Sequence, residues 1–279
     1  MARPLRIEYP GAVYHIMSRG NASVDIFKDS QDREYFLKTI QRIIERFNVR
    51  LYAYCLMNNH YHLVVETPDG NLTRCMHYLN FRYSQWFNFR HSRVGHLFQG
   101  RYKSIVVEKN SYLLEVIRYV SLNPVRASIC PDPENYEWSS YPVTLGKQDV
   151  LPLLETDWIL SHFGSRKTTA RKKFKKFISE GHDVKLWDEI QRQIYLGDED
   201  FVSLLQEELV SDKELDEIPK QQYRSLAPLS LIFEKYNNRD SAIIEAFESG
   251  EFTQREIAAH LGLHYSTVSK IISKQHVSS

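Results

Sequence analysis

Two histidines separated by one residue are the first side chains in this sequence that could act together. His60 and His62 flank Tyr61, and the apolar run Leu63-Val64-Val65 follows them. Residues two apart on a β-strand point to the same face, so both imidazoles could bind one metal ion. The same pattern also suits two half-exposed strand histidines that bind nothing. The apolar run favours the metal site, because it would anchor the strand in the core while the histidines lie at its start.

A tyrosine and an asparagine four residues apart form a second candidate pair. Tyr119 and Asn123 lie in the apolar segment 114–124, whose spacing is typical of a helix. Residues i and i+4 share a helix face, so the phenol and the amide could reach one site. Because the residue before a proline avoids the α conformation, we expect Pro124 to end the helix and leave Asn123 at its terminus. The alternative is that Tyr119 only packs in the core. A tyrosine in an apolar helix is usually a core residue, and this chain has 17 tyrosines.

Together these side chains could cut and rejoin a phosphodiester. A phenol has a pKa of about 10, so at neutral pH it is a weak nucleophile that needs help. A metal ion held by two imidazoles and an amide oxygen would polarise the phosphodiester and offset the charge that develops in the transition state. Attack by tyrosine would leave a phosphotyrosyl link that keeps the energy of the broken bond, so rejoining would need no nucleotide cofactor. In agreement, the sequence has no GxxxxGK[ST] loop.

The elements that would carry these residues alternate between strands and helices. We expect strands over 14–18, 51–57, 60–66 and 102–107, and helices over 30–47, 71–89 and 111–122. Ser30 is the expected N-cap of the first helix, and Asn58-Asn59 the tight connection between the second and third strands. The order β-α-β-β-α-β-α indicates an α+β fold with a ferredoxin-like domain and an antiparallel sheet.

We expect the chain to have three parts. These are a ferredoxin-like catalytic domain over 1–141, a helical extension over 142–220 with a basic helix near 166–177, and a helix-turn-helix region over 221–279. The region after the sheet is therefore expected to be all-α.

Composition and charge suit a soluble protein that binds a polyanion. Apolar residues make up 42% of the chain and charged residues 25%, and no run approaches the roughly 18 apolar residues that a membrane helix needs. Met1–Arg6 lacks the apolar core of a secretory signal, and three cysteines without a CxxC argue against a disulfide framework. We therefore expect a cytoplasmic protein with no membrane partner. The first 130 residues hold 18 Lys and Arg against 10 Asp and Glu, which favours a nucleic acid.

Five motifs in order resemble a known family, the single-tyrosine HUH transposases and in particular the REP-associated tyrosine transposases. The resemblance covers about residues 11–141 and rests on Arg19-Gly20-Asn21, the segments 58–63, 96–104 and 119–126, and Trp138-Ser139-Ser140-Tyr141. Each motif alone is weak, but the ordered set is specific. Tyr61 stands where the family's His-hydrophobic-His motif usually has a bulky hydrophobe, which is an acceptable variant.

The resemblance implies a role for each candidate residue. His60 and His62 would be metal ligands, Asn123 the third ligand, and Tyr119 the nucleophile that forms a 5′-phosphotyrosyl intermediate. The resemblance also implies that the metal ion is Mg²⁺ or Mn²⁺. The types of the ligands alone would be compatible with zinc as well. The implied substrate is single-stranded DNA with a hairpin beside the cleavage site, and the family often works as a homodimer.

Further residues are expected to contact DNA. Near the proposed site we expect such contacts from Arg19, Asn21, Arg101, Lys103 and Arg126. The aromatic helix 78–89 is expected to serve the core rather than to stack bases. The basic helix near 166–177 suits either a solvated face or phosphate contacts.

The segment 252–272 fits a helix-turn-helix. Gly262 would make the turn between the two helices, and Leu263 and Val268 would pack inward. The second helix would present five residues to the major groove of duplex DNA: Tyr265, Ser266, Thr267, Ser269 and Lys270. An αα-hairpin used only for packing is the alternative.

The sequence therefore predicts a metal-dependent, single-stranded DNA transposase and endonuclease. Two other functions stay open. One is a DNA-binding regulator that uses the helix-turn-helix and has a non-catalytic transposase-like domain. The other is a metal-dependent hydrolase with water as its nucleophile, which would release free ends and never a protein–DNA adduct.

Overall fold

The computed structural model of this chain describes residues 7–148, 154–181, 186, 194–211, 229–236, 238–248, 252 and 254–275. The chain divides into two compact units, 1–209 and 210–279, which we describe separately. The expected boundary at 220/221 lies outside the described residues, and the three-part division stays a prediction. Among the described helices, none combines the length and the apolar character needed to cross a bilayer.

A five-stranded sheet forms the centre of the first unit. Its strands are β1 Ala12–Arg19, β2 Arg50–Met57, β3 His60–Thr67, β4 Lys103–Val107 and β5 Tyr195–Leu196, in the order β2-β3-β1-β4-β5. The first four strands pair antiparallel, and with α1 and α2 between them they have the β-α-β-β-α-β connectivity expected from the sequence.

The fifth strand corrects the expectation of a purely antiparallel sheet followed by an all-α region. β5 pairs parallel with β4, where Val106 N donates to Ile194 O and Glu108 N to Leu196 O, both at 2.8 Å. Two residues are too few to show a strand's alternation in a sequence. The short strand satisfies backbone groups that the edge of β4 would otherwise expose.

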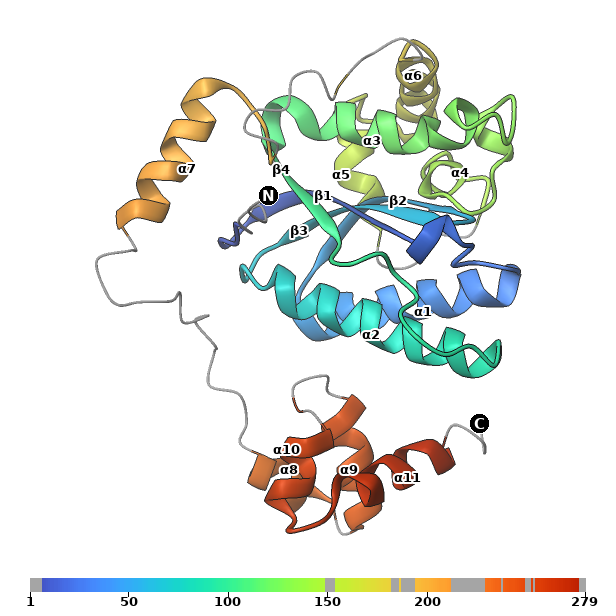
Figure 1. Ribbon diagram of the computed structural model, residues 1–279. Helices are drawn as coiled ribbons and strands as arrows, with labels where there is room; N and C mark the ends of the chain where they lie inside the picture. The colour runs from blue at the N-terminus through green and yellow to red at the C-terminus, as the bar shows by residue number, and fades with distance from the viewer. Residues whose placement is uncertain are drawn as a thin grey trace. The chain divides into compact units, whose positions relative to one another are not determined.

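Helices cover both faces of the sheet (Figure 1). The helices of the first unit are α1 Ser30–Phe47, α2 Leu72–Arg90, α3 Lys109–Arg126, α4 Ser140–Thr144, α5 Thr156–Ser161, α6 Lys167–Ser179 and α7 Glu199–Ser211, with single 3₁₀ turns η1 Asn21–Ser23 and η2 Pro133–Asn135. α1 and α2 lie against one face, which we call the α1–α2 face, and α3, α5 and α6 lie on the other, which we call the α3 face.

The alternation of strand residues builds one core on each face. On β3, Tyr61, Leu63 and Val65 belong to the core of the α1–α2 face, whereas Val64 belongs to the core of the α3 face. The same period of two sends His60 and His62 to the α3 face. β1 behaves alike, since Tyr14 and Ile16 face α1 and α2 while Val13 faces α3.

Two expected helix boundaries were wrong. The N-cap of α1 is Asp29 rather than Ser30, because the Asp29 carboxylate accepts a hydrogen bond from Asp32 N at 3.1 Å. α3 does not end at Asn123 but runs through Pro124 to Arg126. Pro124 lies in the last turn, so its missing N–H removes a single helical hydrogen bond, and its buried ring packs within the core. Asn123 is therefore a helical residue and not a terminal one.

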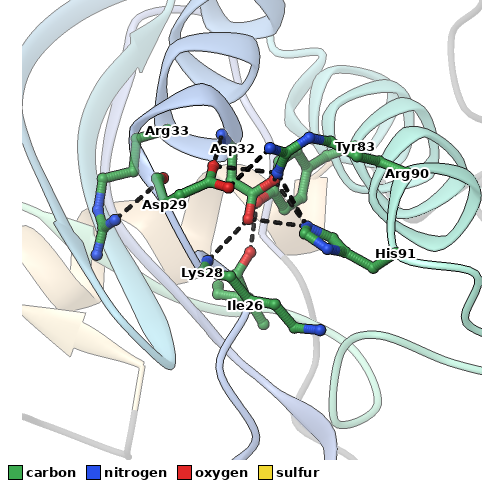
Figure 2. A network of polar contacts seen from close by, with 8 residues as sticks. All are labelled: Ile26, Lys28, Asp29, Asp32, Arg33, Tyr83, Arg90 and His91. Carbon is green, nitrogen blue, oxygen red and sulfur yellow. Dashed lines mark hydrogen bonds and ion pairs between the residues drawn. The ribbon is translucent and has the colours of Figure 1, made fainter.

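A polar network fastens the start of α1 to the end of α2 (Figure 2). Asp32 is fully buried, and its carboxylate accepts from Lys28 N at 2.8 Å and Arg90 Nη1 at 2.6 Å and lies 3.0 Å from His91 Nε2. Asp29 pairs with the same Arg90 at 2.7 Å. We call these four side chains the α1–α2 clamp: Asp29, Asp32, Arg90 and His91.

The second unit is a small helical cluster. Its described helices are α8 Leu229–Lys235, α9 Arg239–Glu248, α10 Gln254–His260 and α11 Tyr265–Gln275. α10 and α11 are joined by four residues, in which Gly262 has a φ of 65° that glycine adopts without strain. Ile257, Ala258 and Val268 are buried between the helices.

Candidate active site

The start of β3 places two histidines side by side on the α3 face. His60 is half-buried and His62 is buried. Their ring centroids are 5.0 Å apart and the ring planes are at 82° to each other. Tyr61, between them, belongs to the core of the opposite face. The alternation of a single strand thus separates the two imidazoles from the aromatic core behind them.

Helix α3 brings Tyr119 to these histidines. The half-buried Tyr119 ring has its centroid 6.0 Å from that of His62 and packs against it edge to face. The guanidinium carbon of Arg126 lies 4.8 Å from the centre of the Tyr119 ring. The phenol therefore has an imidazole and a cation as neighbours, although 57 positions separate Tyr119 from His62 in the chain.

A third imidazole, which the sequence analysis missed, completes the group. His15 on β1 is buried, and its Nε2 lies 2.9 Å from His62 Nδ1. The two rings are stacked, with centroids 5.1 Å apart and an angle of 4° between the planes, and the His15 ring is 6.0 Å from that of Tyr119. The only signal in the sequence is a polar residue at an inward position of an apolar strand.

Both histidines of β3 use the same ring nitrogen for a contact within the protein. His60 Nδ1 donates to Asn59 Oδ1 at 2.6 Å, and His62 Nδ1 shares its hydrogen bond with His15 Nε2. Such contacts fix the orientation and the tautomer of an imidazole and are typical of metal-binding histidines. The arrangement leaves Nε2 of each ring for a ligand.

Burial keeps these imidazoles neutral. Burial lowers the pKa of His15 to about 3 and brings the pKa of His62 well below its ordinary value, with His15 and then His60 adding to the shift. Burial, followed by the positive charge of Arg19, also lowers the pKa of His60. A neutral imidazole keeps the lone pair that metal coordination requires.

Asn123 lies on the same helix as Tyr119, and its side chain hydrogen-bonds to the backbone of that helix. It is buried, and its Nδ2 donates to Tyr119 O at 3.0 Å, one turn back along α3. This hydrogen bond leaves the amide oxygen, the atom that could act as a ligand. Among the residues described, no cluster of three or more His, Cys, Asp or Glu side chains is placed to hold a metal ion.

The loops around His60 are held by backbone hydrogen bonds between three of the sequence motifs. Asn59 O accepts from Gly20 N at 2.8 Å, while Arg19 O accepts from Gln99 N and Leu97 O from Asn21 N, both at 2.8 Å. A side chain at position 20 would place its Cβ 2.0 Å from Val24 O, so the close approach requires glycine. Motifs far apart in the sequence therefore meet beside the histidines.

The other residues expected to bind DNA near this site lie on different elements. Arg19 ends β1, hydrogen-bonds Ser23 and acts on the pKa of His60. Asn21 is exposed in η1, and Arg101 and Lys103 are exposed at the start of β4. Arg126 contacts Tyr119 and donates to Gly181 O at 3.0 Å. Arg19 and Arg126 thus adjoin the candidate site directly.

In the second unit, the residues expected to read duplex DNA lie along the first turns of α11. Tyr265 is 50% exposed and Lys270 is exposed, whereas Ser266 and Thr267 are half-buried. His264 Nδ1 and Ser266 Oγ are 2.8 Å apart at the start of the helix.

The comparison with family models agrees with the motifs. A family model described as IS200-like transposase matches residues 9–123. The solved structure of a REP-associated tyrosine transposase bound to a REP hairpin is similar to this chain at 14% sequence identity, with a TM-score of 0.45. That match covers 57% of this chain and 91% of the other. No curated protein matches the sequence.

Proposed function

We propose that this chain, whose residues 9–123 match the family model of IS200-like transposases, cuts and rejoins single-stranded DNA with Tyr119 as its nucleophile. The match agrees with the family expected from the sequence and supports a transposase that acts on DNA. The single-stranded substrate, the metal ion and the covalent intermediate belong to our proposal.

One observation carries the proposal. His60 and His62 lie together with both Nδ1 atoms engaged by Asn59 and His15, and the Tyr119 ring packs against His62. A pair of histidines that served only the core would not need a tyrosine ring from another element packed against it. The arrangement matches what metal-assisted attack by a tyrosine requires.

The residues present fit a divalent metal ion. In the proposed site, two neutral imidazoles and the amide oxygen of Asn123 would provide a mixed nitrogen and oxygen donor set, of the kind that suits several divalent ions. The choice of Mg²⁺ or Mn²⁺ follows from the family resemblance. When bound, the ion would polarise the scissile phosphate and stabilise the charge of the transition state.

The chain's own residues would then carry the bond exchange. The Tyr119 oxygen bonds to phosphorus as the bond from phosphorus to the 3′ oxygen breaks, which leaves a 5′-phosphotyrosyl link and a free 3′-hydroxyl. The phenolic proton leaves, and the departing 3′ oxygen takes up a proton, so the exchange is balanced. Arg126 beside the Tyr119 ring and Arg19 beside His60 supply positive charge for the DNA phosphates.

The second unit is proposed to bind duplex DNA as a helix-turn-helix. The turn at Gly262, the buried Ala258 and Val268, and the exposed Tyr265 and Lys270 support this role for α10 and α11. In the full chain, Lys270→Gln should weaken duplex binding and reduce its salt dependence by about one phosphate contact. An unchanged salt dependence would leave these helices a packing role only.

Other parts of the proposal rest on the resemblance. They are a hairpin beside the cleavage site, a homodimer and a cytoplasmic location. The regulator with a non-catalytic domain is not favoured, because the site keeps His62 in contact with both His60 and Tyr119. A hydrolase that uses water would not need Tyr119 at this position.

The decisive experiment detects the covalent intermediate. Purified protein is incubated with Mn²⁺ and a labelled library of single-stranded hairpins, then separated on a denaturing gel. A DNA adduct that mass spectrometry maps to Tyr119 would establish the function. Cleaved ends without an adduct would favour the hydrolase, and binding with no cleavage of any library member would favour the regulator.

A further inference from the structure

A cavity on the α1–α2 side of the first unit has a lining unlike that of the core. It is open to solvent and has a volume of about 490 Å³, which falls within the range of about 300–1,000 Å³ that is usual for small-molecule sites. One wall comes from α2 and the other from the loop before β4. Its lining includes Asn80, Phe81, Ser84, His96, Arg101 and Tyr102. Among the described residues that line it, none is acidic.

The α2 wall offers a flat aromatic surface with polar groups beside it. Phe81 is half-buried, and its ring lies parallel to that of His77, with centroids 5.8 Å apart and an angle of 9° between the planes. Asn80 Oδ1 accepts a hydrogen bond from the Tyr61 hydroxyl at 2.8 Å, which leaves the two amide hydrogens of Asn80 as donors. The Ser84 hydroxyl adds a further polar group. A planar ring with carbonyl or ring-nitrogen acceptors suits this wall.

The opposite wall adds a positive charge. Arg101 is exposed, and within the described part of the chain it forms no ion pair. Its guanidinium can therefore bind a phosphate without first breaking a contact in the protein. An aromatic surface next to an arginine is the combination with which proteins hold the base and the phosphate of single-stranded nucleic acid.

The cavity is joined to the candidate active site through the sheet and through one loop. Tyr61, which bonds Asn80 in the cavity wall, stands between His60 and His62 on β3. The loop that supplies His96 and Arg101 is hydrogen-bonded to the β1 end beside His60, through Leu97 O and Gln99 N. The start of β3 and the end of β1 therefore contact both the candidate active site and the wall of the cavity.

We propose that this cavity binds one unstacked base of the single-stranded DNA substrate, with the base on Phe81 and the neighbouring phosphate on Arg101. The inference rests on the proposed function and adds a base-binding site to it. It also revises the expectation that the aromatic helix serves the core alone. Tyr83 and Phe87 are buried as expected, but Phe81 on the same helix lines the cavity.

Binding of two labelled 12-mers, without metal ion, tests the proposal. One probe is oligo-deoxythymidine, and the other is an abasic strand with the same sugar-phosphate backbone. Phe81→Leu should weaken binding of the thymidine strand by about 5- to 160-fold, the range expected for one stacked base, and leave the abasic strand unaffected. Phe89→Leu is the matched control, because Phe89 lies on the same helix, is 61% exposed and does not line the cavity.

A second variant tests the proposal even if Phe81→Leu fails to fold. Arg101→Gln changes an exposed side chain, and it should weaken both probes and lower the salt dependence by about 0.7 in the log–log slope. Arg42→Gln, at an exposed position of α1, should change neither. Equal effects of Phe81→Leu on the two probes, or the same effect from Phe89→Leu, would overturn the proposal. So would wild-type protein that binds the two strands equally.

The outcomes separate this inference from the proposed function. A Tyr119 adduct together with no base-dependent loss in Phe81→Leu would reject the cavity site and keep the enzyme. A base-dependent loss without any adduct would keep the cavity as a DNA site and reject the nucleophile.

Discussion

The two faces of the central sheet carry different chemistry although the same strands build both. On the α3 face, three imidazoles and a phenol lie in contact, and burial keeps the imidazoles neutral. On the α1–α2 face, the clamp holds the buried carboxylate of Asp32 in an ion pair with Arg90, with His91 Nε2 3.0 Å from the same carboxylate. Strand alternation allows this division, since adjacent residues of β3 never share an environment.

The difference indicates which face can be altered without loss of the fold. Neutral groups with nitrogens left for a ligand are suited to chemistry, whereas a buried ion pair costs much when one partner is removed. We therefore expect variants of the imidazole and phenol group on the α3 face to lose activity and keep their stability. Variants of the α1–α2 clamp should lose stability and keep the chemistry.

The largest effect is expected at Tyr119. Tyr119→Phe removes only the hydroxyl from a half-buried ring, so packing against His62 stays while the attacking oxygen is gone. Adduct formation should be abolished, and DNA binding should stay within about twofold of the wild type. A denaturing gel and a binding titration measure the two quantities. An adduct that survives in the Phe variant would assign the nucleophile elsewhere.

His60→Ala should have the next largest effect. Loss of one proposed ligand should slow Mn²⁺-dependent cleavage by about 10²- to 10³-fold, the size of effect seen when one group that stabilises a transition state is removed. His162→Ala changes an exposed histidine on the same side of the sheet and serves as the control. Cleavage at the wild-type rate in His60→Ala would remove the ligand role.

His15 should act through His62 rather than on the DNA. His15→Leu keeps an apolar side chain at the buried position but loses the 2.9 Å hydrogen bond to His62 Nδ1. We expect Mn²⁺ to bind about 10- to 100-fold more weakly, as is usual when the hydrogen-bond partner of a metal ligand is removed. His15→Gln, which can still bond His62, should recover part of the affinity. Calorimetric titration distinguishes the variants; equal affinity in His15→Leu would make His15 a core residue only.

Residues with a periodic spacing were predictable from the sequence, and residues brought together by register were not. His60, Tyr61 and His62 follow the period of a strand, and Tyr119 that of a helix, so their elements and faces could be inferred. His15 joins His62 only because β1 and β3 pair with Met17 opposite His62. A single histidine in an apolar strand carries no spacing that indicates its partner.

The boundaries were wrong where local preference was overridden by the surroundings. Pro124 disfavours a helical residue before it, yet burial of the last turn of α3 outweighs one missing hydrogen bond. β5 is too short to be recognised before its partner is known. The cavity by Phe81 escaped prediction for a related reason, since half of its wall comes from a loop without periodic pattern.

The smallest effect is expected at Asp29, the partly exposed carboxylate of the α1–α2 clamp, and concerns the free energy of unfolding. The Arg90 guanidinium holds the pKa of the Asp29 carboxyl below its ordinary value. The ion pair therefore stabilises the fold above the ordinary carboxyl pKa of about 4, and this contribution is lost as the pH falls through the lowered pKa. Asp29→Asn keeps an amide that can cap α1 but removes the charge.

Because Asp29 is 46% exposed, its side chain is partly screened, and the variant should lose at most about 1 kcal/mol of unfolding free energy at pH 7. The difference in stability should disappear as the pH falls through the lowered pKa of Asp29, and Tyr119 should form its adduct at the wild-type rate at pH 7. Urea unfolding at a series of pH values below 7 measures the difference. A slower adduct without a change in stability would mean that the α1–α2 face takes part in the chemistry after all, and the division between the faces would fail.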